Sequence, residues 1–272
     1  MDSNGKIVLI TGCAKGGIGC RVVASDLAHR LSGIIDEPDG PADAEVIGID
    51  VADDKSVELA VAEVLGRHGR IDVLVNNAGI GCTGPLAELN LDVVRRAWEV
   101  NALGQLRMVQ AVAPSMISRR SGCIVNVGSI VGSVPTPWAG SYCASKAMVH
   151  AMSDSLRLEL KPFGIHVIKV LPGAVKSNFG KADTEKVGLL QEWRLYGEFK
   201  EAIAERARAS QGARATDASE LARHVARKVL SRKPPRQIVF GHMTGLFAVL
   251  GLSSTLSDWF FARRFGLNKK LP

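Results

Sequence analysis

Tyr142 and Lys146 lie four residues apart within residues 141–146, which read SYCASK. In a helix this spacing places both side chains on one face, one turn apart. A phenol, with a pKa of about 10, is a poor acid or base at neutral pH, but an ammonium held close to it favours the phenolate and brings its pKa towards the working range. The pair therefore suits proton transfer to or from a substrate oxygen.

Ser129 lies just after the apolar residues 123–127 and precedes Tyr142 in the chain. The apolar run predicts a buried strand, so Ser129 would stand at the carboxyl end of a strand, where ligands bind in open α/β sheets. A hydroxyl there can hold a substrate oxygen while Tyr142 protonates it. Tyr-x-x-x-Lys by itself is a weak motif, because surface pairs of this kind are common by chance.

Glycines are concentrated in residues 11–19, TGCAKGGIG, directly after the strand-like residues 6–10. Gly12, Gly17 and Gly19 would let backbone amides approach a pyrophosphate, and the N-terminus of a following helix favours the same anion. The position of this loop directly after a strand makes it a stronger signal than a glycine-rich loop alone.

Three further motifs follow: Asn-Asn-Ala-Gly at 76–79 after a strand-like run, Asn101 within a helical region predicted from Leu89 to about residue 118, and Pro-Gly at 172–173 after another strand. In this order and spacing, the motifs closely resemble those of the short-chain dehydrogenase/reductase family over nearly the whole chain. The Gly-Gly-Ile-Gly loop, the run PWAGSY and the C-terminal region look most like the 1-acyldihydroxyacetone-phosphate reductases of plants and fungi.

The resemblance implies an α/β fold, a doubly wound, Rossmann-like parallel sheet flanked by helices, in a single domain spanning residues 1–272. It also implies a homo-oligomer, because two long helices commonly form a four-helix dimer interface in the family. Residues 178–215 would form a substrate lid, and we call residues 240–272, which are apolar and basic, the tail.

Catalytic roles follow from the resemblance for four residues. Tyr142 would exchange the proton, Lys146 would tune Tyr142 and hold the nicotinamide ribose, Ser129 would orient the carbonyl, and Asn101 would hold a kinked backbone and a water that relays protons to Lys146. The cofactor-binding residues that it implies are Gly12, Lys15, Gly17, Ile18, Gly19, Asp50, Val51, Asn77, Ala78, Gly79, Tyr142, Lys146, Pro172, Gly173 and Ser177.

The interval between Gly19 and the strand-like residues 45–50 is short by roughly one helix for a segment that should hold two crossovers. One interpretation is a helix through Val23 and Leu27, followed by a short strand at 33–36. The other is a strand at 21–26 that ends in Asp26, with the first helix lost. Hydrophobic periodicity favours the helix, which we predict, and the resemblance favours the strand. We also predict that the shortened segment leaves sheet surface uncovered and weakens the adenosine pocket.

Composition places the chain among globular proteins, with 46% hydrophobic residues and no apolar run long enough to span a bilayer. The five cysteines lack metal-ligand spacing and predict reduced, mostly buried thiols in a cytosol-facing protein, and we predict no metal. The net charge is +7, with the basic excess late in the chain. It indicates solvated helix faces or, alternatively, contact with an anionic substrate group or membrane, rather than nucleic acid.

We therefore predict an NADP(H)-dependent oxidoreductase that interconverts a lipophilic ketone and its secondary alcohol, such as an acyl ketone phosphate. Lys15 can face a 2′-phosphate, whereas an acid at the end of strand two, Asp26 or Asp36, would favour NAD(H). The alternatives are a non-catalytic dinucleotide-binding scaffold and a steroid or retinoid dehydrogenase. The tail would either cover the substrate pocket or contact the endoplasmic reticulum or lipid-droplet membrane peripherally.

Overall fold

The computed structural model describes residues 5–12, 21–30, 45–179 and 192–269. Seven parallel strands form one sheet in the order β3-β2-β1-β4-β5-β6-β9. They are β1 Ile7–Thr11, β2 Arg21–Asp26, β3 Glu45–Gly48, β4 Val73–Asn76, β5 Gly122–Val127, β6 Ile165–Pro172 and β9 Gln237–Phe240. The predicted doubly wound fold is confirmed. The strand order reverses between β1 and β4, so a crevice is expected beyond their carboxyl ends.

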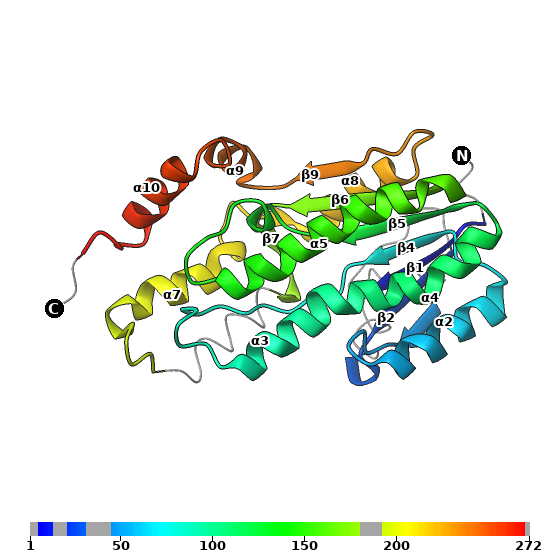
Figure 1. Ribbon diagram of the computed structural model, residues 1–272, viewed down its shortest axis with the longest axis horizontal. Coiled ribbons are helices and arrows are strands. Elements are labelled where there is room, and N and C mark those ends of the chain that lie inside the picture. Colours follow the sequence, from blue (N-terminus) through cyan, green and yellow to red (C-terminus); the bar gives the residue numbers. More distant parts are fainter. Residues whose placement is uncertain (1–4, 13–20, 31–44, 180–191, 270–272) are drawn as a thin grey trace.

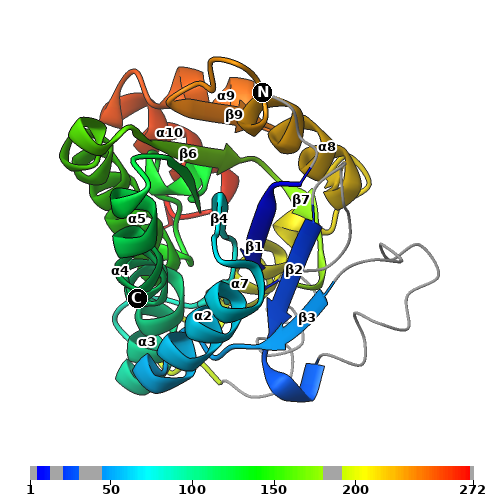
Figure 2. The ribbon, with the colours of Figure 1, turned by 90° about the vertical axis from the view of Figure 1, so that its right-hand side faces the viewer.

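Helices cover both faces of the sheet (Figure 2). One face carries α2 Asp54–His68, α4 Gly104–Ser118 and α5 Gly140–Glu159, and the other carries α8 Ala218–Val229. Strand residues such as Leu9 and Leu74 pack against apolar side chains of α2 and α4 on the first face. Val225 and Val229 of α8 pack against a second cluster of strand residues on the opposite face.

The helical region predicted from Leu89 to about residue 118 is confirmed and contains one irregular turn. It consists of α3 Leu91–Trp98, a π-helical turn Glu99–Leu103 (η2) and α4, which follow one another (Figure 1). The amide of Gly104 donates to the carbonyl of Glu99, five residues earlier, instead of four. Such single π turns insert an extra residue and occur often at functional sites.

Residues 21–26 form strand β2, so the helix predicted there is wrong. Five residues of β2 pair with β1 and four pair with β3. Residues 22–25 are all buried, which means that both faces of this strand are covered. Strands buried on both faces read as continuous apolar runs, and such a run can mimic a helical stripe when it is short. The predicted uncovered sheet surface is therefore also absent at β2, and the alternative strand at 33–36 lies outside the described residues.

The C-terminal part of the described chain adds small elements around the carboxyl end of the sheet. Strand β7 Val175–Lys176 pairs with β8 Thr216–Asp217 in a separate two-stranded sheet. The helices of this part are η5 Gly197–Phe199, α7 Lys200–Ala207, η6 Arg208–Ser210, α9 Thr244–Leu250 and α10 Ser254–Arg264. Figure 1 shows α9 and α10 at one end of the molecule, beyond β9. Within the described ranges, no helix is both long enough and apolar enough to cross a membrane.

Candidate active site

Lys146 stands at the centre of the site, with only 3% of its surface exposed. Its Nζ donates to the carbonyl of Val127, at the end of β5, over 2.9 Å, and lies 5.8 Å from the centroid of the Tyr142 ring. Burial lowers the pKa of Lys146 to about 8. The predicted helical pairing of Tyr142 and Lys146 is confirmed, because both lie on α5, which begins at Gly140.

Tyr142 lies against the loop that carries Ser129. Its ring packs on a buried cluster that includes Ile130, Val131 and Cys143. The ring of Phe179 lies 5.5 Å away, centroid to centroid. The side chains around the phenol are thus apolar on these sides, which leaves its polar edge as the group suited to proton transfer.

Asn101 is fully buried in the π-helical turn, and its side chain is held by three hydrogen bonds. Its Oδ1 accepts from the amide of Ile80 over 2.8 Å, and its Nδ2 donates to the carbonyl of Ile80 and to Oγ of Ser145. Ser145 Oγ in turn donates to the carbonyl of Tyr142 over 2.7 Å. Asn101 therefore ties the irregular turn to the loop after β4 and to α5.

Ser129 occupies the position predicted for it, directly after β5. It caps the short 3-10 turn Ile130–Gly132 (η3), and its Oγ accepts from the amide of Val131 over 3.4 Å. Its hydroxyl therefore has a defined direction, set by the conformation of the turn that follows.

The carboxyl ends of β1 and β4 meet at Gly12 and Asn77. Thr11 Oγ1 accepts from the amides of Asn77 and Ala78 over 3.1 Å each, and Asn77 Nδ2 donates to the carbonyl of Gly12. Gly12 has a φ of 62°, and a Cβ there would lie 2.7 Å from Cα of Ala78, so only glycine fits. This close backbone approach at the switch point of the sheet fits a dinucleotide.

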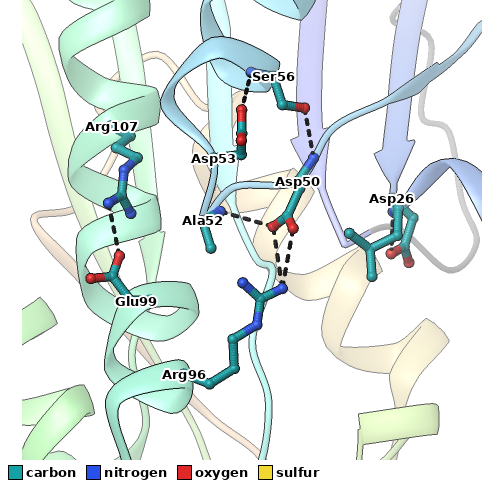
Figure 3. Close-up of polar contacts among 9 residues, drawn as sticks. Asp26, Asp50, Ala52, Asp53, Ser56, Arg96, Glu99 and Arg107 are labelled. Atoms are coloured by element: carbon teal, nitrogen blue, oxygen red, sulfur yellow. Dashed lines mark hydrogen bonds and ion pairs between the residues drawn. The ribbon is translucent and has the colours of Figure 1, made fainter. Parts of the chain in front are cut away.

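Asp50 and Val51, two of the predicted cofactor residues, follow β3. Figure 3 shows Asp50 with its polar contacts. Asp50 Oδ1 accepts from the amide of Ala52 over 2.9 Å, and Oδ2 pairs with Arg96 over 3.1 Å. Burial acts to raise the pKa of Asp50, but the Ala52 amide and the Arg96 guanidinium outweigh it and hold that pKa below its ordinary value. The carboxylate stays ionised and fixed in direction. Asp53 caps the N-terminus of α2, and its Oδ1 accepts from the amide of Ser56.

Asp26 ends β2 and lies on the same side as Asp50 (Figure 3). Its Oδ1 accepts from the amide of Leu27 over 2.7 Å. An acid at this point of a dinucleotide-binding sheet is placed to accept hydrogen bonds from a ribose hydroxyl.

Other predicted cofactor residues lie at or just after the carboxyl ends of β4, β6 and β7. Gly79 is close to two predicted catalytic residues, since a Cβ there would lie 3.3 Å from Oδ1 of Asn101 and 3.7 Å from Nζ of Lys146. Pro172 ends β6 and Gly173 follows it, with Ser177 just after β7. The remaining four, Lys15, Gly17, Ile18 and Gly19, lie outside the described residues.

Sequence reasoning missed two contributors to this site, Ser145 and His150. Ser145 bonds both Asn101 and the backbone of Tyr142, and His150 contacts the loop that carries Ser129. The spacing could have identified His150, because positions 142, 146 and 150 of a helix share one face. The predicted burial of the thiols is confirmed for Cys82, Cys123 and Cys143.

Known proteins share both the sequence pattern and the fold. Residues 6–188 match the family model described as short chain dehydrogenase. Short-chain dehydrogenase RED1 of Pyricularia oryzae is 33% identical over 96% of this chain and 95% of its own length. Short-chain dehydrogenase virD of Hypocrea virens is 34% identical over 99% of this chain and 96% of its own.

Solved structures agree with the sequence relatives. A short-chain dehydrogenase from Streptomyces avermitilis superimposes with a TM-score of 0.76, at 27% identity over 98% of this chain and 99% of the other. A serine dehydrogenase complexed with NADP+ has a TM-score of 0.70, at 26% identity over 88% and 95% of the two chains. The fold and the side chains at its crevice define a dinucleotide-binding oxidoreductase. The chain belongs to the short-chain dehydrogenase family.

Proposed function

We propose that this short-chain dehydrogenase interconverts a lipophilic ketone and its secondary alcohol, with Tyr142 exchanging the proton. The observation that carries the proposal is the buried ammonium of Lys146, held on the carbonyl of Val127 beside the Tyr142 ring. A cation so close to a phenol favours the phenolate and makes the proton easier to move. The nicotinamide, when bound, supplies or accepts the hydride.

Ser129 and Asn101 complete the proposed machinery. The hydroxyl of Ser129 would donate to the substrate oxygen and stabilise the charge that develops there. Asn101 holds the π turn, and both it and Lys146 lie close to Gly79, which suits the predicted support of a proton relay to Lys146. The buried hydrogen bonds of Asn101 to Ile80 show how it keeps its own position while it does so.

For the nucleotide, we propose a preference for NAD(H). The NADP(H) predicted from the sequence rests on Lys15, which lies outside the described residues, and on the resemblance to the 1-acyldihydroxyacetone-phosphate reductases. Asp26, by contrast, is now placed at the end of β2, where its negative charge would repel a 2′-phosphate and accept from a free hydroxyl. Dissociation constants for NADH and NADPH test this choice, and tighter binding of NADPH contradicts it.

An apolar substrate is supported by the aromatic side chains near the site. Phe179 packs on Tyr142, and Trp138, just before α5, packs on Tyr196 and Phe199 at ring distances of 5.5 and 5.4 Å. Arg206 of α7 donates to Oγ1 of Thr136 over 2.9 Å and so joins α7 to the loop before α5. These contacts support a lid role for residues 178–215, of which residues 180–191 lie outside the described residues. They also support a long-chain carbonyl, such as an acyl ketone phosphate, as substrate.

Peripheral contact with an anionic membrane would give such a substrate a direct route to the site. The tail exposes Val249, Leu252 and Trp259, and Arg263 and Arg264 lie in the last turn of α10. Exposed apolar and aromatic groups beside basic groups suit binding at a lipid interface. Co-sedimentation with anionic vesicles at low salt is the test. Two results together would show that the tail serves only the fold. The protein would stay in the supernatant, and a chain truncated after Phe240 would unfold.

A second copy of the chain is the proposed partner of α4 and α5. Their outer face holds a shallow hollow of about 320 Å³ lined by Leu106, Met152 and Leu156 among others, and Leu158 nearby is exposed. Sedimentation equilibrium tests this proposal, and a monomer at all concentrations contradicts it.

The experiment that tests the function is a nucleotide titration of the purified chain, followed by turnover with a panel of acyl, steroid and retinoid carbonyls. Nucleotide binding with turnover of at least one carbonyl is expected. Nucleotide binding with no turnover across the panel would favour the alternative, a dinucleotide-binding scaffold. The panel also separates an acyl ketone reductase from a steroid or retinoid dehydrogenase.

A further inference from the structure

We propose that His150 is a positioning residue that fixes Ser129 by holding the loop that carries it. The proposal deepens the function above and rests on it for its kinetic test. His150 lies on α5 one turn after Lys146 and two turns after Tyr142, on the same helix face. One helix face thus carries the two predicted catalytic side chains and a third side chain aimed at the loop between β5 and α5.

The two ring nitrogens of His150 contact both ends of that loop, residues 128–133, which we call the Ser129 loop. The amide of Ser129 donates to Nε2 over 3.4 Å. Nδ1 lies 3.5 Å from Oγ of Ser133, after the 3-10 turn. The imidazole therefore spans the turn that carries Ser129, one nitrogen at its start and the other at its end.

Close packing holds the ring in this place. His150 is 9% exposed, and the Ser129 loop provides glycine at the two positions that the ring touches. A Cβ on Gly128 would lie 2.5 Å from Nε2, and a Cβ on Gly132 would lie 2.7 Å from Cε1. A larger residue at either position would displace the ring or the loop, so the geometry joins loop and imidazole as one unit.

The charge state of the ring agrees with this role. Burial lowers the pKa of His150 to about 4, with Lys169 of β6 and Lys146 of α5 acting in the same direction and Asp154 of α5 opposing them. At neutral pH the ring is neutral, with one nitrogen donating and the other accepting. Because the Ser129 amide is a donor, Nε2 accepts and Nδ1 carries the hydrogen towards Ser133.

Displacement of the Ser129 loop would act on the chemistry through one atom, Oγ of Ser129. That oxygen accepts from the amide of Val131 inside the same turn, so its direction follows the turn. A misplacement of about 1 Å in a catalytic group can reduce the rate by about 10²-fold. His150 is not one of the residues proposed to contact the substrate, so its effect on the rate should pass through Ser129.

A double-mutant cycle tests that route. His150→Leu keeps an apolar side chain but loses both hydrogen bonds, and we expect kcat to fall by roughly 10- to 100-fold with an unchanged dissociation constant for the nucleotide. In a Ser129→Ala background the same change should cause no further loss, because the atom that it positions is gone. His150→Gln, whose carbonyl can accept from the Ser129 amide, should retain more activity than His150→Leu. His166→Leu, at an exposed position of β6, is the matched control and should leave kcat unchanged.

An equal loss from His150→Leu in both backgrounds would overturn the proposal, as would equal losses in the Leu and Gln variants. If His150→Leu does not fold, Ser133→Ala removes only the partner of Nδ1 and should lower kcat in the same direction, again with no effect in the Ser129→Ala background. Nitrogen NMR of the histidine rings in the full chain needs no turnover, so it separates this proposal from the proposed function. We expect the His150 tautomer protonated at Nδ1, and protonation at Nε2 would contradict it.

Discussion

The two halves of the sheet hold their functional groups in different ways. Around β4, β5 and β6, which we call the catalytic half, the side chains of Asn101 and Lys146 are buried and hydrogen-bonded to the backbone of neighbouring elements. Around β1, β2 and β3, which we call the nucleotide half, the groups proposed to face a nucleotide are backbone at Gly12 and the carboxylates of Asp26 and Asp50, which are only partly buried. Only nine residues, 12–20, connect β1 to β2, fewer than the dozen or so usual for a parallel crossover.

This difference indicates which half tolerates change. The proposed proton transfer depends on side chains fixed by several buried contacts, so loss of one partner leaves another unsatisfied. The proposed nucleotide binding relies on backbone and on carboxylates near solvent, which a shorter connection leaves in place. We therefore expect the largest effects of substitution in the catalytic half and the smallest in the shortened segment.

Tyr142→Phe should have the largest effect. The ring would keep its packing against Phe179 and the Ser129 loop, and only the hydroxyl is lost. We expect turnover to fall by roughly 10²- to 10⁴-fold, the usual contribution of a general acid or base. Steady-state kinetics with a nucleotide titration measure this, and the dissociation constant should stay close to that of the wild type. Near-normal turnover would show that another group moves the proton.

Lys146→Met should change how stability depends on pH. The pKa of Lys146 is about 8 in the folded protein, below its ordinary value of 10.5. Between these values the unfolded chain binds more protons than the folded one, so this group makes the free energy of unfolding rise as the pH rises. Relative to the variant, the wild type should gain on the order of 3 kcal/mol from neutral pH to about pH 10. Urea unfolding of both proteins without nucleotide measures the gain, and parallel pH curves would contradict it.

Asp26→Asn should change the nucleotide preference with little effect on turnover at saturation. Loss of the negative charge removes the repulsion of a 2′-phosphate, so the affinity for NADPH relative to NADH should rise by about tenfold. Isothermal titration with both nucleotides measures the ratio. Asp258→Asn, on α10, is a control that should leave the ratio unchanged. An unaltered ratio in Asp26→Asn would mean that Asp26 does not face the ribose.

Insertion of a relative's first helix after Gly19 should have the smallest effect. From the sequence we expect a gain in melting temperature, because a missing crossover would expose the sheet. The burial of residues 22–25 changes that expectation to no gain, because both faces of β2 are already covered. Thermal unfolding of the chain with and without the insertion decides between these two expectations. A rise of several degrees in the melting temperature would show that the sheet was exposed.

The catalytic half could be predicted from the sequence in detail. Tyr142 and Lys146 lie on one helix, and Ser129 follows a buried strand, because apolar runs and four-residue spacing report on local structure. His150 and Ser145 were missed, although His150 shares the spacing of the other two. Their role depends on contacts with the Ser129 loop and with Asn101, which arise only when the helix packs on the sheet.

The nucleotide half shows the limit of reasoning from periodicity. Val23 and Leu27 fit a helical stripe, but residues 21–26 pair with β1 and β3 over their length. Strand pairing with distant parts of the chain decided the structure there, and local pattern carries no information about it. The resemblance to the family predicted the strand because it includes that long-range pairing implicitly.

Transfer of deuterium from nicotinamide labelled at C4 tests the central claim most directly. The wild-type chain, NADH carrying the label and a long-chain ketone are incubated, and the alcohol formed is examined by mass spectrometry. Our account predicts deuterium on the carbinol carbon in the wild type and, in Tyr142→Phe, almost no product despite bound nucleotide. If labelled NADH binds and no carbonyl of the panel yields a deuterated alcohol, the chain is not the oxidoreductase that its catalytic half indicates.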